Sequence, residues 1–122
     1  MAYDIALKIY MPERVVLDKP VYRVVLPNNE MPLTVIEGRA PTLMAMDMGV
    51  IKILDDNNQT IEEYLIAGGS ADIKEDTCEI LTEAAFNKAE LTLEQVREMN
   101  AEFPNPFYRW LVKEFEKEAN IK

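Results

Sequence analysis

Few side chains in this sequence could carry out covalent chemistry. The chain has no histidine and a single cysteine, Cys78. Ser-His and Cys-His nucleophile pairs, zinc sites built from His and Cys, and an intrachain disulfide are therefore excluded. Ser70 lacks the usual activating base, so we expect no catalytic residue and no metal site. Cys78 lies in an alternating apolar run, which predicts a reduced thiol packed as a small hydrophobe.

Other motifs that resemble chemical sites have simpler interpretations. Gly68-Gly69 is not followed by the Lys-Ser/Thr and helix of a phosphate-binding loop, so it predicts a tight turn with positive φ. Glu62 and Glu63 are neighbours in a predicted strand, so their carboxylates point to opposite faces. The acidic segment 55–60 lacks the correctly placed glycine and closing glutamate of a calcium loop, which favours a plain hairpin loop. We therefore expect no cofactor.

The charge of the chain points to protein partners. It carries 13 Lys and Arg against 22 Asp and Glu, a net charge of −9. Such an acidic chain is a poor ligand for nucleic acids or anionic membrane surfaces. The first residues lack the basic and apolar regions of a secretory signal, and no apolar run approaches a membrane span of about 18 residues. The expected location is the cytoplasm.

Strand signals follow one another over the first two-thirds of the chain. Ile5, Leu7, Ile9 and Met11 are apolar at every second position, as in a strand with one buried face. Further short β-rich runs cover 15–17, 21–26, 33–36, 50–54, 61–67, 71–73 and 78–81. Turn signals separate them at 18–20, 27–29, 37–38, 48–49, 55–58, 68–69 and 75–76. With no helices between the strands, the pattern predicts an antiparallel sandwich or barrel.

The period becomes helical after about residue 87. Thr92 and Gln95 have the spacing of a capping box, and Asn105-Pro106 is typical of a second helix start. The first helix is predicted to present Leu93, Val96, Met99 and Phe103 on one stripe, and the second Phe107, Leu111, Phe115 and Ala119. We thus expect two domains, a β-sandwich over 1–86 and a short helical tail over 87–122.

The aromatic cluster Phe107, Tyr108 and Trp110 in the tail has two interpretations. An aromatic stripe at helical spacing usually packs into a core, here within the hairpin and against the sandwich. A short hairpin cannot bury three large rings by itself, however, so part of the cluster could dock a partner. The sequence leaves both open.

Three blocks of the sequence resemble the epsilon subunit family of bacterial and chloroplast F-type ATP synthases, which corresponds to the mitochondrial delta subunit. They are Leu7-Lys-Ile-Tyr-Met-Pro-Glu-Arg-Val-Val-Leu-Asp18, the stretch from Val24-Val-Leu-Pro27 to Glu37-Gly-Arg-Ala-Pro41, and the stretch from Met48-Gly-Val50 through Leu65-Ile-Ala-Gly-Gly69 to Cys78-Glu-Ile-Leu-Thr-Glu-Ala84. The resemblance implies a mainly β fold, an antiparallel β-sandwich of about ten strands followed by a short C-terminal α-helical hairpin.

The resemblance also implies a function and partners. It implies a non-catalytic central-stalk rotor subunit that links the gamma subunit to the proteolipid ring and couples ion flow to ATP synthesis, with a tail that can modulate hydrolysis. Such a subunit is peripheral, at the cytoplasmic face of the bacterial inner membrane. Ring contacts are implied for Asn28, Asn29, Glu30, Met31, Pro32 and Leu33. Gamma contacts are implied for Arg39, Ala40, Pro41 and Thr42, and tail docking for Phe107, Trp110 and Leu111.

The sequence departs from the family pattern in the loop before Pro41 and in the tail, which is shorter than the usual helical hairpin and is broken by Pro104 and Pro106. The glycines usually found upstream of Glu37-Gly38 are replaced around 31–34, and the family's ATP-binding signature is not reproduced at 93–98. The alternative interpretation is a free-standing β-sandwich that binds proteins or carbohydrates. An aromatic-lined face would support it, but the aromatic residues before position 87 are few: Tyr3, Tyr10, Tyr22, Tyr64 and Phe86.

Overall fold

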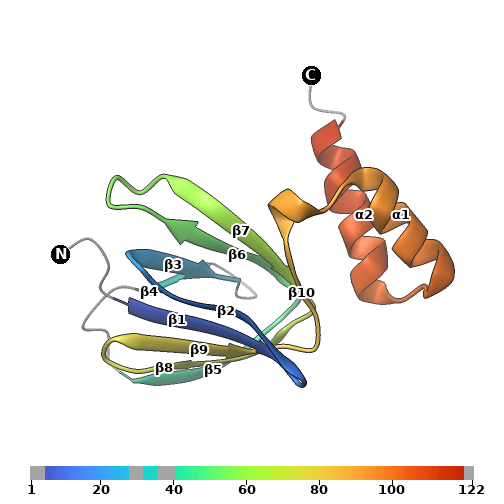
Figure 1. Ribbon diagram of the computed structural model, residues 1–122. Coiled ribbons are helices and arrows are strands. Elements are labelled where there is room, and N and C mark those ends of the chain that lie inside the picture. Colours follow the sequence, from blue (N-terminus) through green and yellow to red (C-terminus); the bar gives the residue numbers. More distant parts are fainter. Residues whose placement is uncertain (1–4, 28–31, 36–40, 120–122) are drawn as a thin grey trace. The chain divides into compact units, whose positions relative to one another are not determined.

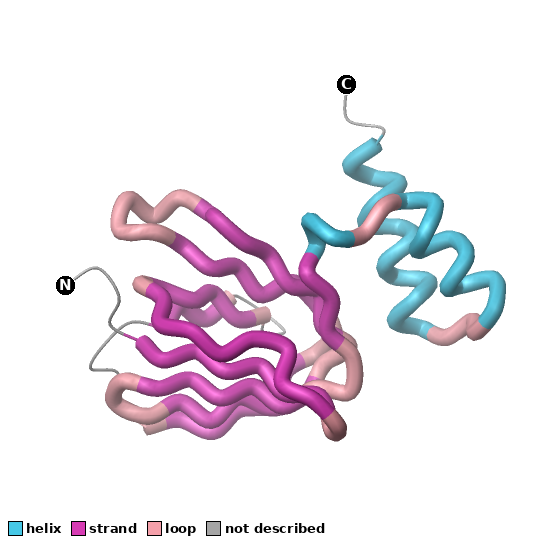
Figure 2. The backbone as a smooth tube through the Cα atoms, viewed as in Figure 1, coloured by secondary structure: helices cyan, strands magenta, loops and turns pink. Residues whose placement is uncertain are grey.

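The computed structural model describes residues 5–27, 32–35 and 41–119. The chain forms two compact units, Met1–Asn87 and Lys88–Lys122. Strands make up the first unit and helices the second (Figures 1 and 2). Within the described residues, neither helix is long and apolar enough to cross a bilayer.

The first unit consists of two five-stranded sheets, as the predicted mainly β sandwich requires. Sheet A has the strand order β2-β1-β9-β8-β5 and sheet B the order β10-β7-β6-β3-β4. Sheet A contains β1 (Ile5–Met11), β2 (Arg14–Val21), β5 (Thr42–Met46), β8 (Gly69–Ile73) and β9 (Thr77–Leu81). Sheet B contains β3 (Arg23–Leu26), β4 (Leu33–Val35), β6 (Gly49–Leu54), β7 (Thr60–Ile66) and β10 (Ala85–Asn87).

The core lies between the two sheets and follows from the alternating pattern. Ile5, Leu7 and Ile9 of β1 are fully buried, while the residues between them are half-buried. Ile51 and Ile53 of β6 supply the same alternation from sheet B. Adjacent side chains of a strand point to opposite faces, so one apolar face from each sheet closes the sandwich.

One strand pair departs from the predicted antiparallel arrangement. β1 pairs with β9 in parallel, from Ala6 opposite Thr77 to Tyr10 opposite Leu81. Parallel neighbours need a long connection, and here seven strands separate β1 from β9 along the chain. The local pattern of a strand carries no information about such a distant partner.

Three segments of the strand prediction are corrected. The predicted turn at 18–20 is wrong, because β2 continues through Pro20 to Val21. β2 lies at the edge of sheet A, where a proline costs no ladder hydrogen bond. Strand β5 was not predicted, since its outward residues Leu43 and Ala45 are apolar too and hide the alternation. The predicted strand 21–26 is interrupted at Tyr22.

The second unit contains a 3-10 turn, η1 (Lys88–Glu90), and helices α1 (Leu93–Glu102) and α2 (Pro106–Ala119). Both predicted helix starts are confirmed. The Gln95 backbone N–H donates to Thr92 Oγ1 at 3.2 Å, and the Thr92 N–H donates to Gln95 Oε1 at 2.9 Å. At α2, Asn105 Oδ1 accepts from the Tyr108 N–H at 2.8 Å.

The two helices pack as a hairpin. Arg97 of α1 and Glu116 of α2 form an ion pair at 2.9 Å, and Lys88 pairs with Glu118. Val96 and Leu111 are fully buried. Phe103, expected on the buried stripe of α1, is 70% exposed. It caps the helix with a non-helical φ of −136°, so its side chain leaves the stripe.

Candidate functional site

The stretch expected to contact the ring is described only in part. Asn28, Asn29, Glu30 and Met31 lie outside the described residues. Pro32 is exposed, and Leu33 begins β4 opposite Leu26 of β3. Leu33 also packs partly against the sandwich core, so this end of the stretch is anchored to the fold.

The stretch expected to contact gamma is likewise divided. Arg39 and Ala40 lie outside the described residues. Pro41 is exposed, and Thr42 begins β5 opposite Ile73 of β8. Thr42 therefore starts an edge strand of sheet A, whereas Leu33 starts an edge strand of sheet B.

Leu33 and Thr42 lie at opposite ends of the sandwich. Leu33 pairs with Leu26, the residue before Pro27. Pro27 packs closely on Gly49, the first residue of β6: a Cβ added to Gly49 would lie 2.7 Å from the Pro27 Cβ. Thr42 lies at the other end, where the β6–β7 and β8–β9 turns are found (Figure 1). The two expected contact stretches therefore include described residues at the two ends of one compact unit.

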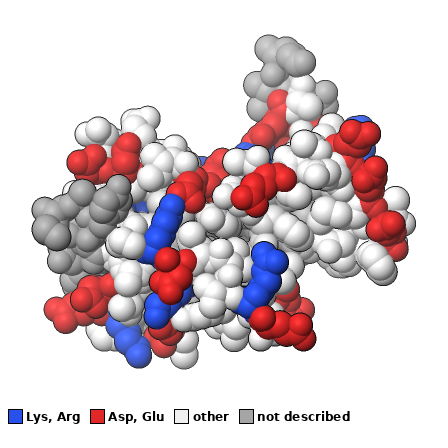
Figure 3. All heavy atoms as spheres, viewed as in Figure 1, with Lys and Arg blue, Asp and Glu red and all other residues white. Residues whose placement is uncertain are grey.

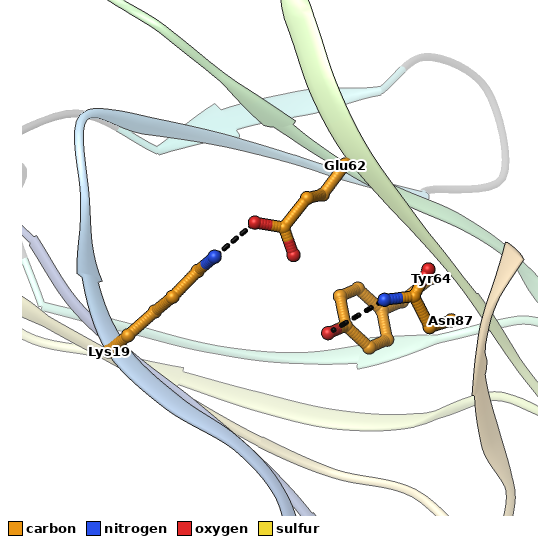
Figure 4. Close-up of polar contacts among 4 residues, drawn as sticks. All are labelled: Lys19, Glu62, Tyr64 and Asn87. Carbon is orange, nitrogen blue, oxygen red and sulfur yellow. Dashed lines mark hydrogen bonds and ion pairs between the residues drawn. The ribbon is translucent and has the colours of Figure 1, made fainter. Parts of the chain in front are cut away.

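Polar contacts join strands between these ends. Lys19 of β2 forms an ion pair with Glu62 of β7, which links sheet A to sheet B (Figure 4). Asn87 Nδ2 of β10 donates to the Tyr64 hydroxyl of β7 at 3.4 Å. The side chains of this ion pair are 39% and 25% exposed, so the shared apolar core, more than this contact, holds the two sheets together.

The glycine pair 68–69 and the acidic loop 55–60 stabilise turns of the sandwich. Gly68 and Gly69 have φ values of 99° and 142°, as predicted for a glycine-dependent turn. In the β6–β7 loop, Asp55 Oδ1 accepts hydrogen bonds from the backbone N–H groups of Asn57 and Gln59 at 2.8 and 2.9 Å. These are turn-stabilising contacts. Among the described residues, no three His, Cys, Asp or Glu side chains are grouped to hold a metal ion.

Cys78 is buried in sheet A and free, as predicted for a small core residue. Burial, with smaller contributions from the negative charges of Asp72 and Glu79, raises the pKa of its thiol from 9.0 to about 12. The thiol therefore stays protonated at neutral pH. Since the thiolate is the reactive form, Cys78 is a structural residue.

The aromatic cluster of the tail is partly buried. Phe107 is buried and stacks on half-buried Trp110, with ring centroids 6.0 Å apart and an interplanar angle of 19°. Tyr108 lies 6.0 Å from Phe107 in a tilted arrangement. Leu111 is fully buried. The docking role of Phe107, Trp110 and Leu111 stays a prediction.

Charged side chains are dispersed over the surface. Figure 3 shows acidic side chains distributed over the visible face, with basic ones among them. The structure also reveals exposed apolar residues that the sequence interpretation missed, Val15, Leu43 and Leu81. A signal for Leu81 was available, because it follows buried Ile80 at a position where the alternation calls for a polar residue.

The fold defines a class: a two-sheet β-sandwich followed by a helical hairpin, with its candidate contacts at the ends of the sandwich. Residues 4–88 match the family model described as ATP synthase, Delta/Epsilon chain, beta-sandwich domain. The chain therefore belongs to the ATP synthase delta/epsilon family.

Similar sequences and structures agree with this assignment. The ATP synthase epsilon chain of Nostoc punctiforme is 32% identical over 93 residues, covering 76% of this chain and 68% of its own length. That of Chelativorans sp. is 34% identical over 91 residues, covering 75% and 67%. In the cryo-EM structure of the Euglena gracilis mitochondrial ATP synthase, one chain matches with a TM-score of 0.67 at 20% identity, covering 91% of this chain and 74% of that one. The latter likeness shows a shared fold.

Proposed function

We propose that this chain is a non-catalytic rotor subunit in the central stalk of an F-type ATP synthase. It joins the gamma subunit to the proteolipid ring and passes torque between them, so that ion flow drives ATP synthesis on other subunits. In this role it is peripheral, at the cytoplasmic face of a bacterial inner membrane. No chemical step occurs on the chain itself, and its partners are proteins.

The proposal rests on where the two expected contact stretches lie in this chain, which belongs to the ATP synthase delta/epsilon family. Leu33 and Thr42, one from each stretch, lie at opposite ends of a sandwich whose sheets share one core and an inter-sheet ion pair. A body that contacts one neighbour at each end and does not shear can transmit rotation. The free-standing binding module would require none of this geometry, so family membership and geometry favour the rotor subunit.

Reconstitution tests the proposal. We expect the chain to restore ATP synthesis driven by an ion gradient when added to ATP synthase depleted of its epsilon subunit. Arg39→Glu should reduce assembly about tenfold, because it reverses the charge of the residue expected to face gamma. The isolated variant should melt at the wild-type temperature, since the role proposed for Arg39 is a contact with another subunit. Normal assembly and coupling with Arg39→Glu would remove Arg39 from the interface.

The helical tail is proposed to be a separate domain, residues 87–122, that lowers ATP hydrolysis. A chain ending at residue 86 should therefore support assembly, and the reconstituted complex should hydrolyse ATP about two- to threefold faster than with the full chain. The core residues of the sandwich all precede residue 87, so the shortened chain keeps its complete core. Equal hydrolysis rates with the full and shortened chains would eliminate an inhibitory tail.

A further inference from the structure

The ion pair of Lys19 and Glu62 is formed from positions that face the core. Lys19 of β2 is the cross-strand partner of Leu7, and Glu62 of β7 is the partner of Ile53. Directly opposite residues lie on the same face of a sheet, and Leu7 and Ile53 are both fully buried. Each sheet therefore carries one charged side chain at a core-facing position, and the two point toward each other (Figure 4).

The sandwich is open where these two charges meet. β2 is an edge strand of sheet A. In sheet B, β10 pairs with β7 from Tyr64 to Ile66 and ends before it reaches Glu62. The side chains of Lys19 and Glu62 are only partly buried, so the ion pair is accessible from solvent. We call this opening the β2–β7 seam.

A cavity of about 250 Å³ lies in the β2–β7 seam, with one member of the ion pair in its wall. The residues that line it are Lys19, Pro20, Val21, Tyr22, Ile53 and Ile61. Val21 and Ile53 belong to the buried core, so the cavity reaches the interior of the sandwich. Ile61 is a bulge residue, because the register of β7 against β6 shifts between Ile53 and Leu54. Bulges redirect a side chain, and here that side chain forms part of the apolar wall.

The aromatic wall of the cavity is held in place by neighbouring side chains. Tyr22 lies where the chain passes from β2 to β3. The guanidinium carbon of Arg23 lies 5.0 Å from the centre of the Tyr22 ring, which is a cation–π contact. Arg23 also donates a hydrogen bond to Asn58 Oδ1 in the β6–β7 loop. A wall that is ordered in advance lowers the entropic cost of binding a ligand.

The size and charge of the cavity restrict the ligand that would fit it. Ligand pockets commonly measure about 300–1,000 Å³, so this cavity is small and suits a single aliphatic or aromatic side chain. Its rim carries a positive and a negative group in contact. A ligand with only one charge would pair with one of these groups and leave the other without its partner. A ligand with adjacent positive and negative groups satisfies both.

We propose that the β2–β7 seam binds a free α-amino acid with an apolar side chain. The carboxylate of the ligand pairs with Lys19 and its ammonium group pairs with Glu62. The apolar side chain fills the cavity above Val21 and Ile53. The inference goes beyond the proposed function and does not depend on it, because every contact is supplied by this chain.

An NMR titration of the full chain with three matched probes tests the class of ligand. L-Leucine carries both charges, isocaproate lacks the ammonium group and isoamylamine lacks the carboxylate. We expect leucine to bind with a dissociation constant of about 1 mM or below and to shift the backbone amide signals of β2 and β7. Each analogue with one charge should bind about tenfold more weakly, because it forms one charged contact fewer.

Two neighbouring residues of β7 provide a matched pair of variants. Glu62 and Glu63 are adjacent in the strand, so their side chains lie on opposite faces of sheet B. Glu62→Gln should weaken leucine binding about tenfold, and leucine and isocaproate should then bind alike, because the ammonium group has lost its charged partner. Glu63→Gln should leave the affinity for leucine unchanged.

A second matched pair tests the apolar wall without touching a charge. Ile61 and Val15 are both β-branched and are 51% and 55% exposed, but only Ile61 lines the cavity. Ile61→Ala should weaken leucine binding about fivefold through lost apolar contact. Val15→Ala should leave it unchanged. Thermal melts of all four variants establish that each is folded.

Three results would overturn the inference. Equal binding of leucine, isocaproate and isoamylamine would mean that the ion pair does not select the ligand. Leucine binding that both Glu62→Gln and Ile61→Ala leave intact would place the site elsewhere. If leucine does not bind and Lys19→Met self-associates in sedimentation, the inward charge instead protects the edge strand β2 from pairing with another sheet. None of these measurements involves another subunit, so the proposed function stands in each case.

Discussion

Gly69→Ala should destabilise the sandwich by about 4 kcal/mol and lower its melting temperature by roughly 20 °C. Gly69 has a φ of 142°, a conformation that alanine adopts only with strain of about 1–3 kcal/mol. An added Cβ would also lie 2.0 Å from the carbonyl oxygen of Leu81, which belongs to the neighbouring strand β9. Because both groups are backbone, relief requires the β8–β9 ladder to shift, and overpacking of this kind costs about 1–3 kcal/mol more.

Urea unfolding followed by far-UV circular dichroism measures the effect. Ser70→Ala is the matched control, since Ser70 is the next residue of β8 and lies half-buried on the outer face. It should change the free energy of unfolding by less than about 1 kcal/mol. If Gly69→Ala were no less stable than Ser70→Ala, the tight approach of β8 to Leu81 would be contradicted.

The features that the sequence predicted correctly are those fixed by nearby residues. The capping box of Thr92 and Gln95, the Asn105 cap and the Gly68-Gly69 turn each depend on contacts within a few positions. The alternation in β1 also needs no distant information, because one buried face alone imposes it. In these segments local chemistry and the final fold agree.

Two of the features that the sequence pattern missed depend on distant partners, and a third depends on the residues of the strand itself. The continuation of β2 through Pro20 depends on the edge position of the strand, and the parallel pairing of β1 with β9 depends on the whole topology. β5 was hidden because Leu43 and Ala45 are apolar on its outer face. The alternation test therefore fails where the outward residues of a strand are apolar as well.

The candidate contacts were less predictable than the fold. They came from resemblance alone, because no spacing of residues within 28–33 or 39–42 specifies a partner. Of the ten residues expected there, the structure describes Pro32, Leu33, Pro41 and Thr42. Their positions at opposite ends of the sandwich depend on strand order, which the sequence pattern does not encode.

Ile80→Ala should destabilise the sandwich by about 3 kcal/mol, while Leu81→Ala should change its stability by less than about 0.5 kcal/mol. The two residues are adjacent in β9, but Ile80 is fully buried between the sheets and Leu81 is 54% exposed. Removing Ile80 leaves a cavity beside β1 and β8, and large-to-small core changes of this kind cost about 2–5 kcal/mol. Leu81 faces solvent, so shortening its side chain to alanine leaves no such cavity.

Urea unfolding of both variants measures this difference. An unfolding midpoint for Leu81→Ala equal to that of the wild type, with a much lower midpoint for Ile80→Ala, is the result expected from the burial of the two side chains. A large loss of stability in Leu81→Ala would instead mean that the Leu81 side chain is covered within the chain.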